Sequence, residues 1–180
     1  RGKRLQFEYH NQKSSRVLTP NEQIVVRSFA EQIQADIRTA IKTKRITKFG
    51  AVNSSGRLHD SVEIVYADNG FKIIANGYIE GLIDGIAPGQ STAKVSDIKT
   101  WINDKPVSTP LPTNTLAYLI TRSISKKGNM VWRTHKGANS GLLEDALAQG
   151  KFDTFVDLIA SQAVEGLTEN IVNAFDIKTE

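Results

Sequence analysis

Cysteine is absent from the 180 residues of the sequence. This absence excludes a disulfide framework and any metal site built from thiolates, and it fits a reducing compartment. Long apolar runs are also missing, because no stretch approaches the ~20 residues of a membrane-spanning helix and no signal peptide is recognisable. We therefore expect one domain with extensions and no membrane partner. The sequence begins at Arg1 rather than methionine, which leaves open whether residues precede it.

Catalytic motifs are equally scarce. The sequence has no glycine-flanked nucleophilic serine and no HExxH pair, and its glycine-spaced residues 77–92 lack the Lys-Ser/Thr ending of a phosphate-binding loop. The best candidate is His59, which on a strand would share a face with Ser61 and Glu63 and could serve a hydrolytic or metal role. We favour the competing interpretation, an exposed strand start with hydrogen-bonding roles. We therefore expect neither enzyme activity nor a cofactor or metal site.

Basic residues gather in three stretches, although the formal net charge is only +4. Residues 1–16 carry five basic side chains against one glutamate, residues 38–48 carry five basic side chains, and residues 126–136 carry four. The last four are Lys126, Lys127, Arg133 and Lys136. Two interpretations are open: solvated surfaces with a loose arm, or contact with nucleic acid or an acidic partner.

The clearest local signal is the start of a long helix at Thr19. Thr19 can act as the N-cap, Pro20 fits the first helical position, and Glu22 completes a capping box. Apolar residues then recur at a spacing of four, which predicts one buried stripe over about six turns. The stripe comprises Val25, Phe29, Ile33, Ile37 and Ile41, with Val26 and Ala40 beside it.

A β-hairpin is predicted around Asn69-Gly70, a pair that favours two-residue type I′ turns because both residues must adopt positive φ. This turn would place Tyr66 opposite Ile73. Side chains alternate along a strand, so one face of the hairpin is apolar. That face comprises Val62, Ile64, Tyr66, Phe71, Ile73 and Ala75. A two-stranded hairpin is marginal alone, so we expect the long helix to cover this face. The predicted fold is α+β, with a long N-terminal amphipathic helix packed on a small antiparallel sheet.

Further helices are predicted toward the C-terminus. One is capped by Ser96 and stopped by Pro106. Three others are expected over residues 114–127, 142–148 and 152–175, with Met130–Trp132 as a short strand. We interpret Trp101 and Trp132 as core or interface anchors rather than base-stacking platforms. Arg57 is expected to form a salt bridge rather than to read DNA.

The remaining segments are expected to be loops and an arm. Glycines and Pro88 predict a mobile loop over residues 77–92. Residues 1–18 predict an extended or disordered arm, in which the spacing of Phe7 and Tyr9 allows a short edge strand. The expected organisation is a basic arm over residues 1–18, an α+β domain over residues 19–150, and a C-terminal helix over residues 151–180 that packs on the domain or on a neighbour.

Three short motifs follow one another in a distinctive order. Ser55-Gly56-Arg57-Leu58 precedes the predicted hairpin, and Ala117-Tyr118-Leu119-Ile120 belongs to a helix that ends at Gly128. Between them lie Tyr78, Gly85, Pro88-Gly89, Trp101-Ile102 and Lys105. In order and spacing these motifs resemble the tail-completion (neck or minor tail) proteins of long-tailed DNA bacteriophages. The resemblance covers roughly residues 20–150. The chain departs from the family pattern at Thr92-Ala93-Lys94, where prolines are common, and at Pro106, where a glycine is common.

The resemblance implies a structural virion protein of the phage neck or tail, assembled in the host cytoplasm. It implies a ring of this chain, sixfold or twelvefold, with portal, neck or tail-tube proteins as neighbours. Candidate contact residues are Arg1, Lys3, Arg4, Phe7, Tyr9, Gly85, Pro88 and Gly89, and candidate DNA-facing residues are Lys126, Lys127, Arg133 and Lys136. Contact with DNA is expected to be weak and salt-sensitive, because strong binding would stall its passage. The alternative is a basic nucleic-acid-binding module.

Overall fold

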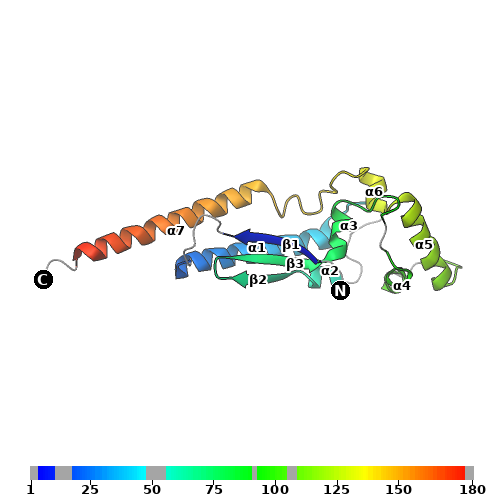
Figure 1. Ribbon diagram of the computed structural model, residues 1–180, viewed down its shortest axis with the longest axis horizontal. Coiled ribbons are helices and arrows are strands. Elements are labelled where there is room, and N and C mark those ends of the chain that lie inside the picture. Colours follow the sequence, from blue (N-terminus) through cyan, green and yellow to red (C-terminus); the bar gives the residue numbers. More distant parts are fainter. Residues whose placement is uncertain (1–3, 11–17, 48–55, 91–92, 105–108, 177–180) are drawn as a thin grey trace.

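The structure is a computed structural model that describes residues 4–10, 18–47, 56–90, 93–104 and 109–176. A long N-terminal helix packs on a small antiparallel sheet and further helices follow, which confirms the predicted α+β class. Figure 1 shows an elongated molecule in which helix α7 (Gln149–Asp176) projects at one end. Helices α4 (Val95–Asp104) and α5 (Thr113–Lys127) lie at the other end.

Helix α1 (Pro20–Thr43) begins where the sequence predicts. The Thr19 Oγ1 accepts from the Glu22 backbone N–H at 3.3 Å, and Glu22 Oε2 accepts from the Thr19 backbone N–H at 2.7 Å. This capping box satisfies two backbone donors that the first turn would otherwise leave unpaired. The buried face confirms the predicted stripe and comprises Val26, Ala30, Ile33, Ile37, Ala40 and Ile41. Phe29 is partly buried against the same core.

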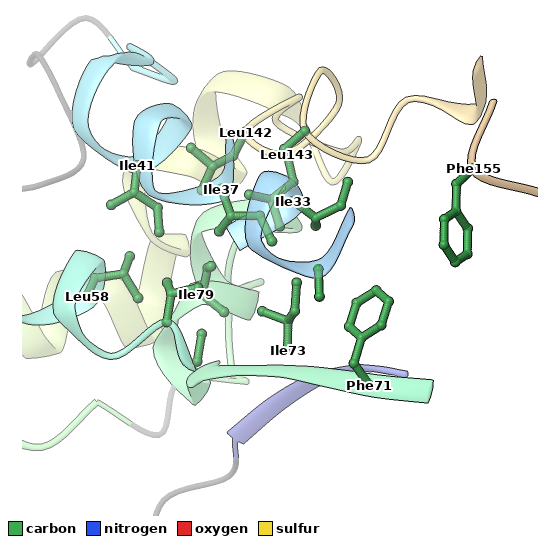
Figure 2. Packing of buried hydrophobic residues seen from close by; sticks show 14 of the residues in the cluster. Ile33, Ile37, Ile41, Leu58, Phe71, Ile73, Ile79, Leu142, Leu143 and Phe155 are labelled. Atoms are coloured by element: carbon green, nitrogen blue, oxygen red, sulfur yellow. The ribbon is translucent and has the colours of Figure 1, made fainter. Parts of the chain in front are cut away.

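The sheet has three strands, with β3 (Gly70–Asn76) between β1 (Arg4–His10) and β2 (Glu63–Ala67). Both pairings are antiparallel. Phe71 and Ile73 of β3 are buried in the core that α1 covers. Figure 2 shows Ile33 and Ile37 between Ile73 of the sheet and Leu142 and Leu143 of the C-terminal region. Helix α1 is therefore covered on both sides, as the middle layer of the core.

The hairpin register differs by two residues from the predicted one. Ala67 pairs with Gly70, so the turn is Asp68-Asn69 and Tyr66 lies opposite Phe71. Neither Asn69 nor Gly70 has a positive φ, so the type I′ prediction is wrong. Gly70 instead belongs to β3, where β1 pairs with it as well, and this tertiary pairing overrides the local turn preference. A shift of two residues keeps the predicted side chains on one face. On that face Val62, Phe71, Ile73 and Ala75 are buried, whereas the predicted burial of Tyr66 is wrong, because its side chain is exposed.

Residues 77–83, predicted as part of a mobile loop, are helical. A 3₁₀ turn, η1 (Gly77–Ile79), leads directly into helix α3 (Glu80–Ile83). Ile79 is fully buried, and its burial draws this segment onto the core. The loop prediction is therefore wrong for these residues, and residues 91–92 lie outside the described chain.

The other corrections concern short elements. Helix α2 (Arg57–Asp60) replaces the predicted strand start, and helix α6 (Met130–His135) replaces the predicted strand at Met130–Trp132. Asn129 explains α6, because its Oδ1 accepts from the Trp132 N–H at 2.8 Å as an N-cap. Residues 142–147 form consecutive turns rather than a helix, with Leu142 and Leu143 both directed into the core. Helix α4 begins before Ser96, so the predicted cap there is wrong.

Part of the predicted arm is a β-strand. Residues Arg4–His10 form the edge strand β1, which confirms the short-strand alternative, while residues 1–3 and 11–17 lie outside the described chain. Among the helices that the structure describes, none has both the length and the apolar character needed to cross a bilayer.

Candidate subunit interface

Helix α7 is anchored to the core by its first turns. The Phe155 ring stacks on the Phe29 ring with centroids 4.1 Å apart and planes 9° apart, and Phe152 meets Phe29 edge-on at 5.3 Å. Lys151 Nζ forms an ion pair with Asp36 Oδ2 of α1 at 2.6 Å. These contacts confine the docking of α7 to its N-terminal end and to α1.

The second half of α7 projects from the core, and the apolar side chains of Val164 and Leu167 on it are exposed. Val164 is 62% exposed and Leu167 is 56% exposed, and Val156 and Leu158 are exposed closer to the anchor. Figure 1 shows this half of the helix extending past the sheet and α1. A helix gains most of its stability by packing an apolar face, and the described residues do not give this face the cover that a helix of this length normally has.

A second exposed apolar surface lies on α5 at the opposite end. Tyr118 is 55% exposed and Leu119 is 45% exposed, while Ala117 faces inward and is fully buried. Helix α4 packs against α5 and presents Trp101, which is 39% exposed. The partial exposure of Trp101 is compatible with the predicted role of an interface anchor, which stays a prediction.

The predicted DNA-facing cations lie where α5 meets α6. Lys126 and Lys127 are in the last turn of α5, Arg133 is in α6, and Lys136 is the C-cap of α6 with φ 54°. All four residues are exposed, and within the described chain none of them takes part in an ion pair. Residues 113–136 contain five Lys and Arg residues and no Asp or Glu. Residues 113–136 are therefore uniformly basic, while the neighbouring helix α4 carries both acidic and basic residues.

The corner that carries these cations is held rigidly by Asn129. Its Oδ1 accepts from the Ile86 N–H at 3.0 Å as well as from the Trp132 N–H, and its Nδ2 donates to the Gly81 carbonyl at 2.8 Å. One side chain therefore joins α3, the connection after it and α6. Sequence reasoning missed this residue, although an asparagine after a helix-ending glycine is a usual N-cap signal.

Of the two glycines predicted to contact a neighbour, Gly85 packs inside the chain and Gly89 lies at the surface. Gly85 has φ +77°, and a Cβ on it would lie 2.6 Å from the Trp132 backbone nitrogen of the same chain. Gly89 has φ +78°, with no atom within 4 Å of the place that a Cβ would take, and Pro88 beside it is exposed. Gly85 is thus a packing position within the chain, and its contact with a neighbour stays a prediction, as does that of Pro88 and Gly89.

The arm residues are placed only in part. Arg4, Phe7 and Tyr9 lie in β1, opposite Asn76, Ile73 and Phe71 of β3. The backbone of these three residues is therefore used within the chain's own sheet. Arg1 and Lys3 lie outside the described residues.

The catalytic candidates His59, Ser61 and Glu63 do not share the face that the sequence suggested. His59 lies in α2, with its Nδ1 at 2.8 Å from Asp60 Oδ1, while the Ser61 hydroxyl donates to the Leu58 carbonyl at 2.8 Å. The predicted shared strand face with Glu63 is wrong, because the chain is helical up to Asp60. Arg57 pairs with Asp104 of α4, as expected for a salt-bridge residue. In the described part of the chain, no three His, Asp or Glu side chains are arranged to hold a metal ion.

A cavity of about 450 Å³ lies between α3 and the turns before α7. Its lining comprises Ile83, Asn139, Gly141, Leu143, Glu144 and Leu147. Beside it, Lys44 Nζ donates to the Gly141 carbonyl at 2.6 Å and pairs with Asp145 Oδ2 at 2.9 Å. The hydrogen bond that Lys44 donates to the Asp145 carboxylate lowers the pKa of Asp145. Glu144 is the one titratable side chain among the lining residues, so this cavity does not assemble an acid–base pair.

Comparison with known proteins adds no relative. No protein-family model, no curated protein and no solved structure matches the chain.

Proposed function

We propose that this chain is a structural subunit of a bacteriophage neck or tail, assembled as a ring of identical copies at the head–tail junction. The observation that carries the proposal is the apolar surface of the second half of α7, which no part of the described chain covers as the core covers its first turns. The order of the Ser55–Leu58, Tyr78–Lys105 and Ala117–Gly128 motifs supports the same class of protein. Portal, neck or tail-tube proteins are the proposed neighbours.

The arrangement of the molecule supports assembly over catalysis. Isolated exposed apolar residues are normal on a protein surface, whereas apolar residues repeated along one helix mark an interaction site. This chain presents such residues on α7 and on α5, at its two ends. A subunit that contacts two neighbours needs two such surfaces, and an elongated shape separates them.

The test is to locate the chain in the virion. Mass spectrometry of purified particles should detect it, and a cryo-EM map of the neck should show a closed ring into which this fold fits. Tailless capsids purified from the same lysate provide the control, because a neck or tail component should be depleted from them. Absence of the chain from complete particles would overturn the proposal.

The second candidate function is a nucleic-acid-binding module, and the uniformly basic residues 113–136 favour it. Binding to duplex DNA is expected to weaken steeply with salt, because each neutralised phosphate releases a counterion. Replacing Lys127 and Arg133 by alanine should reduce the slope of log K against log salt by about one per cation removed. Fluorescence anisotropy with labelled DNA measures that slope. Exchanging Lys42, an exposed cation of α1, for alanine is the matched control, and absence of salt-dependent binding would remove this candidate.

A further inference from the structure

The two exposed apolar surfaces carry opposite charge. From Phe152 to Asp176, α7 contains five Asp and Glu residues and no Lys or Arg. From Thr113 to Lys136, α5 and α6 contain five Lys and Arg residues and no Asp or Glu. The two surfaces are therefore complementary in charge, and both have exposed apolar side chains.

The acidic surface of α7 combines carboxylates with apolar side chains on one face. Asp157, Ala160, Ser161, Val164 and Glu165 lie together on one side of this helix. Asp157 and Glu165 are eight residues apart, so they lie on the same side of the helix about 12 Å from each other. Val164 and Leu167, on either side of Glu165 in the sequence, add exposed apolar side chains. We call this set the acidic face of α7.

The surface of α5 also combines charged with apolar side chains, but its charges are positive. Tyr118, Arg122 and Lys126 follow one another at a spacing of four, which places them in one row along the helix. Leu119 lies beside this row, and all four side chains are exposed. We call this set the basic face of α5. Both faces combine apolar with charged side chains, the two classes that form the centre and the rim of protein interfaces.

The two faces cannot meet within one chain, because they lie at opposite ends of the molecule (Figure 1). Two copies that met through the same face would bring its two like charges against the same two in the partner, Asp157 and Glu165 or Arg122 and Lys126, and that arrangement is disfavoured. We propose that the acidic face of α7 in one copy docks on the basic face of α5 in the next copy. Such a head-to-tail contact uses different surfaces on the two partners, and it closes into a ring when the rotation between successive copies allows. The inference rests on the proposed function for the closed ring and names the contact from which that ring would be built.

Charge reversal of each face tests this contact in the full chain. The first variant carries Asp157→Lys and Glu165→Lys, and the second carries Arg122→Glu and Lys126→Glu. In each variant alone attraction becomes repulsion, so the concentration needed for half-assembly should rise at least about tenfold. Light scattering after size-exclusion chromatography, over a series of protein concentrations at low salt, measures this change. The wild-type assembly should also weaken in high salt.

Combining the changes provides the decisive arm of the experiment. A chain that carries all four substitutions again has complementary faces, so assembly should return. An equimolar mixture of the two double variants should also assemble, because each kind of face then meets its opposite. Lys42→Glu and Glu63→Lys are matched controls at exposed positions of α1 and β2, and they should leave the assembly unchanged.

Two results would overturn the inference: a wild-type chain that stays monomeric throughout the series, or charge-reversed chains that assemble like the wild type. Neither result bears on whether the chain is present in virions. Conversely, the chain could be absent from particles while its assembly is lost in the double variants and restored in the fourfold variant. That result would contradict the proposed function and support the head-to-tail contact. The two failures are therefore distinguishable.

Discussion

Replacing Gly85 by alanine is expected to lower the free energy of unfolding by about 3 kcal/mol, because two costs add at this position. The backbone has φ +77°, which an L side chain adopts only with strain. The new Cβ would also lie 2.6 Å from the backbone nitrogen and 2.7 Å from the Cα of Trp132. Because these are backbone atoms of α6, no side-chain rotation relieves the contact. Urea unfolding followed by circular dichroism measures the loss.

Gly89→Ala is the matched control for this substitution. Gly89 has almost the same backbone angle, φ +78°, but no atom lies within 4 Å of the position that its Cβ would take. Its N–H donates to the Ser125 carbonyl at 2.8 Å, and alanine keeps that donor. Only the backbone strain remains, so the expected cost is about 1 kcal/mol. Equal losses in the two variants would show that α6 does not pack against residue 85 as the structure has it.

Phe29→Ala is expected to cost about 3 kcal/mol and to loosen the first turns of α7. Phe29 links three rings, because it stacks on Phe155 and meets Phe152 and Phe71 edge-on at 5.3 and 6.1 Å. Removing it takes away the aromatic contacts of α1 with α7 and with β3. Urea unfolding gives the stability change. Hydrogen exchange should show reduced protection over residues 149–160, beyond any uniform change in the rest of the molecule.

The control for Phe29 is Phe29→Leu, which keeps most of the apolar volume and loses the ring contacts. We expect a smaller loss of stability and largely retained protection of α7. The ion pair between Lys151 and Asp36 remains in both variants, so any difference between them reports on the aromatic contacts. Unchanged exchange of α7 in Phe29→Ala would contradict the anchoring role of these rings.

The elements that the sequence predicts well are those whose signals are local. The capping box at Thr19 and the apolar spacing through Ile33 and Ile37 define α1 without reference to the rest of the chain. The buried face of β3 follows from the alternation of its side chains alone. The wrong turn prediction does not change this face, because a shift of two residues keeps the same side chains of β3 inward. The helix-ending Gly128 follows in the same way, since it lies four residues after Ile124, the last apolar residue of α5.

The errors arise where distant residues decide the local structure. Gly70 joins β3 because β1 pairs with it, and β1 is separated from it by about sixty residues of chain, an entropic cost that no local rule includes. Met130–Trp132 is helical because Asn129 caps it and bonds back to α3. The glycines at positions 81 and 85 led to the prediction of a mobile loop. In the fold, Gly85 instead permits close contact with the backbone of Trp132.

The candidate interface was predictable only in part. The apolar repeat of α7 is visible in the sequence, but a stripe has the same periodicity whether it packs within the chain or on a neighbour. Only the fold separates Phe155, which is 3% exposed, from Val164, which is 62% exposed, on the same helix. The charge opposition between residues 113–136 and residues 152–176 was also present in the sequence, but its meaning depends on the distance between the two ends.

The placement of the two tryptophans gives the chain a pair of built-in optical probes. Trp132 is half-buried, and the backbones of Gly85, Gly128 and Gly137 surround it, so its emission follows the integrity of the α6 corner. Trp101 is exposed on α4, next to the helix that would receive a neighbouring subunit. A chain with Trp101→Phe therefore isolates the spectroscopic signal of unfolding. Subtracting the emission of this variant from that of the unaltered chain gives the emission of Trp101. That emission reports on a subunit that binds next to α5, without an added dye.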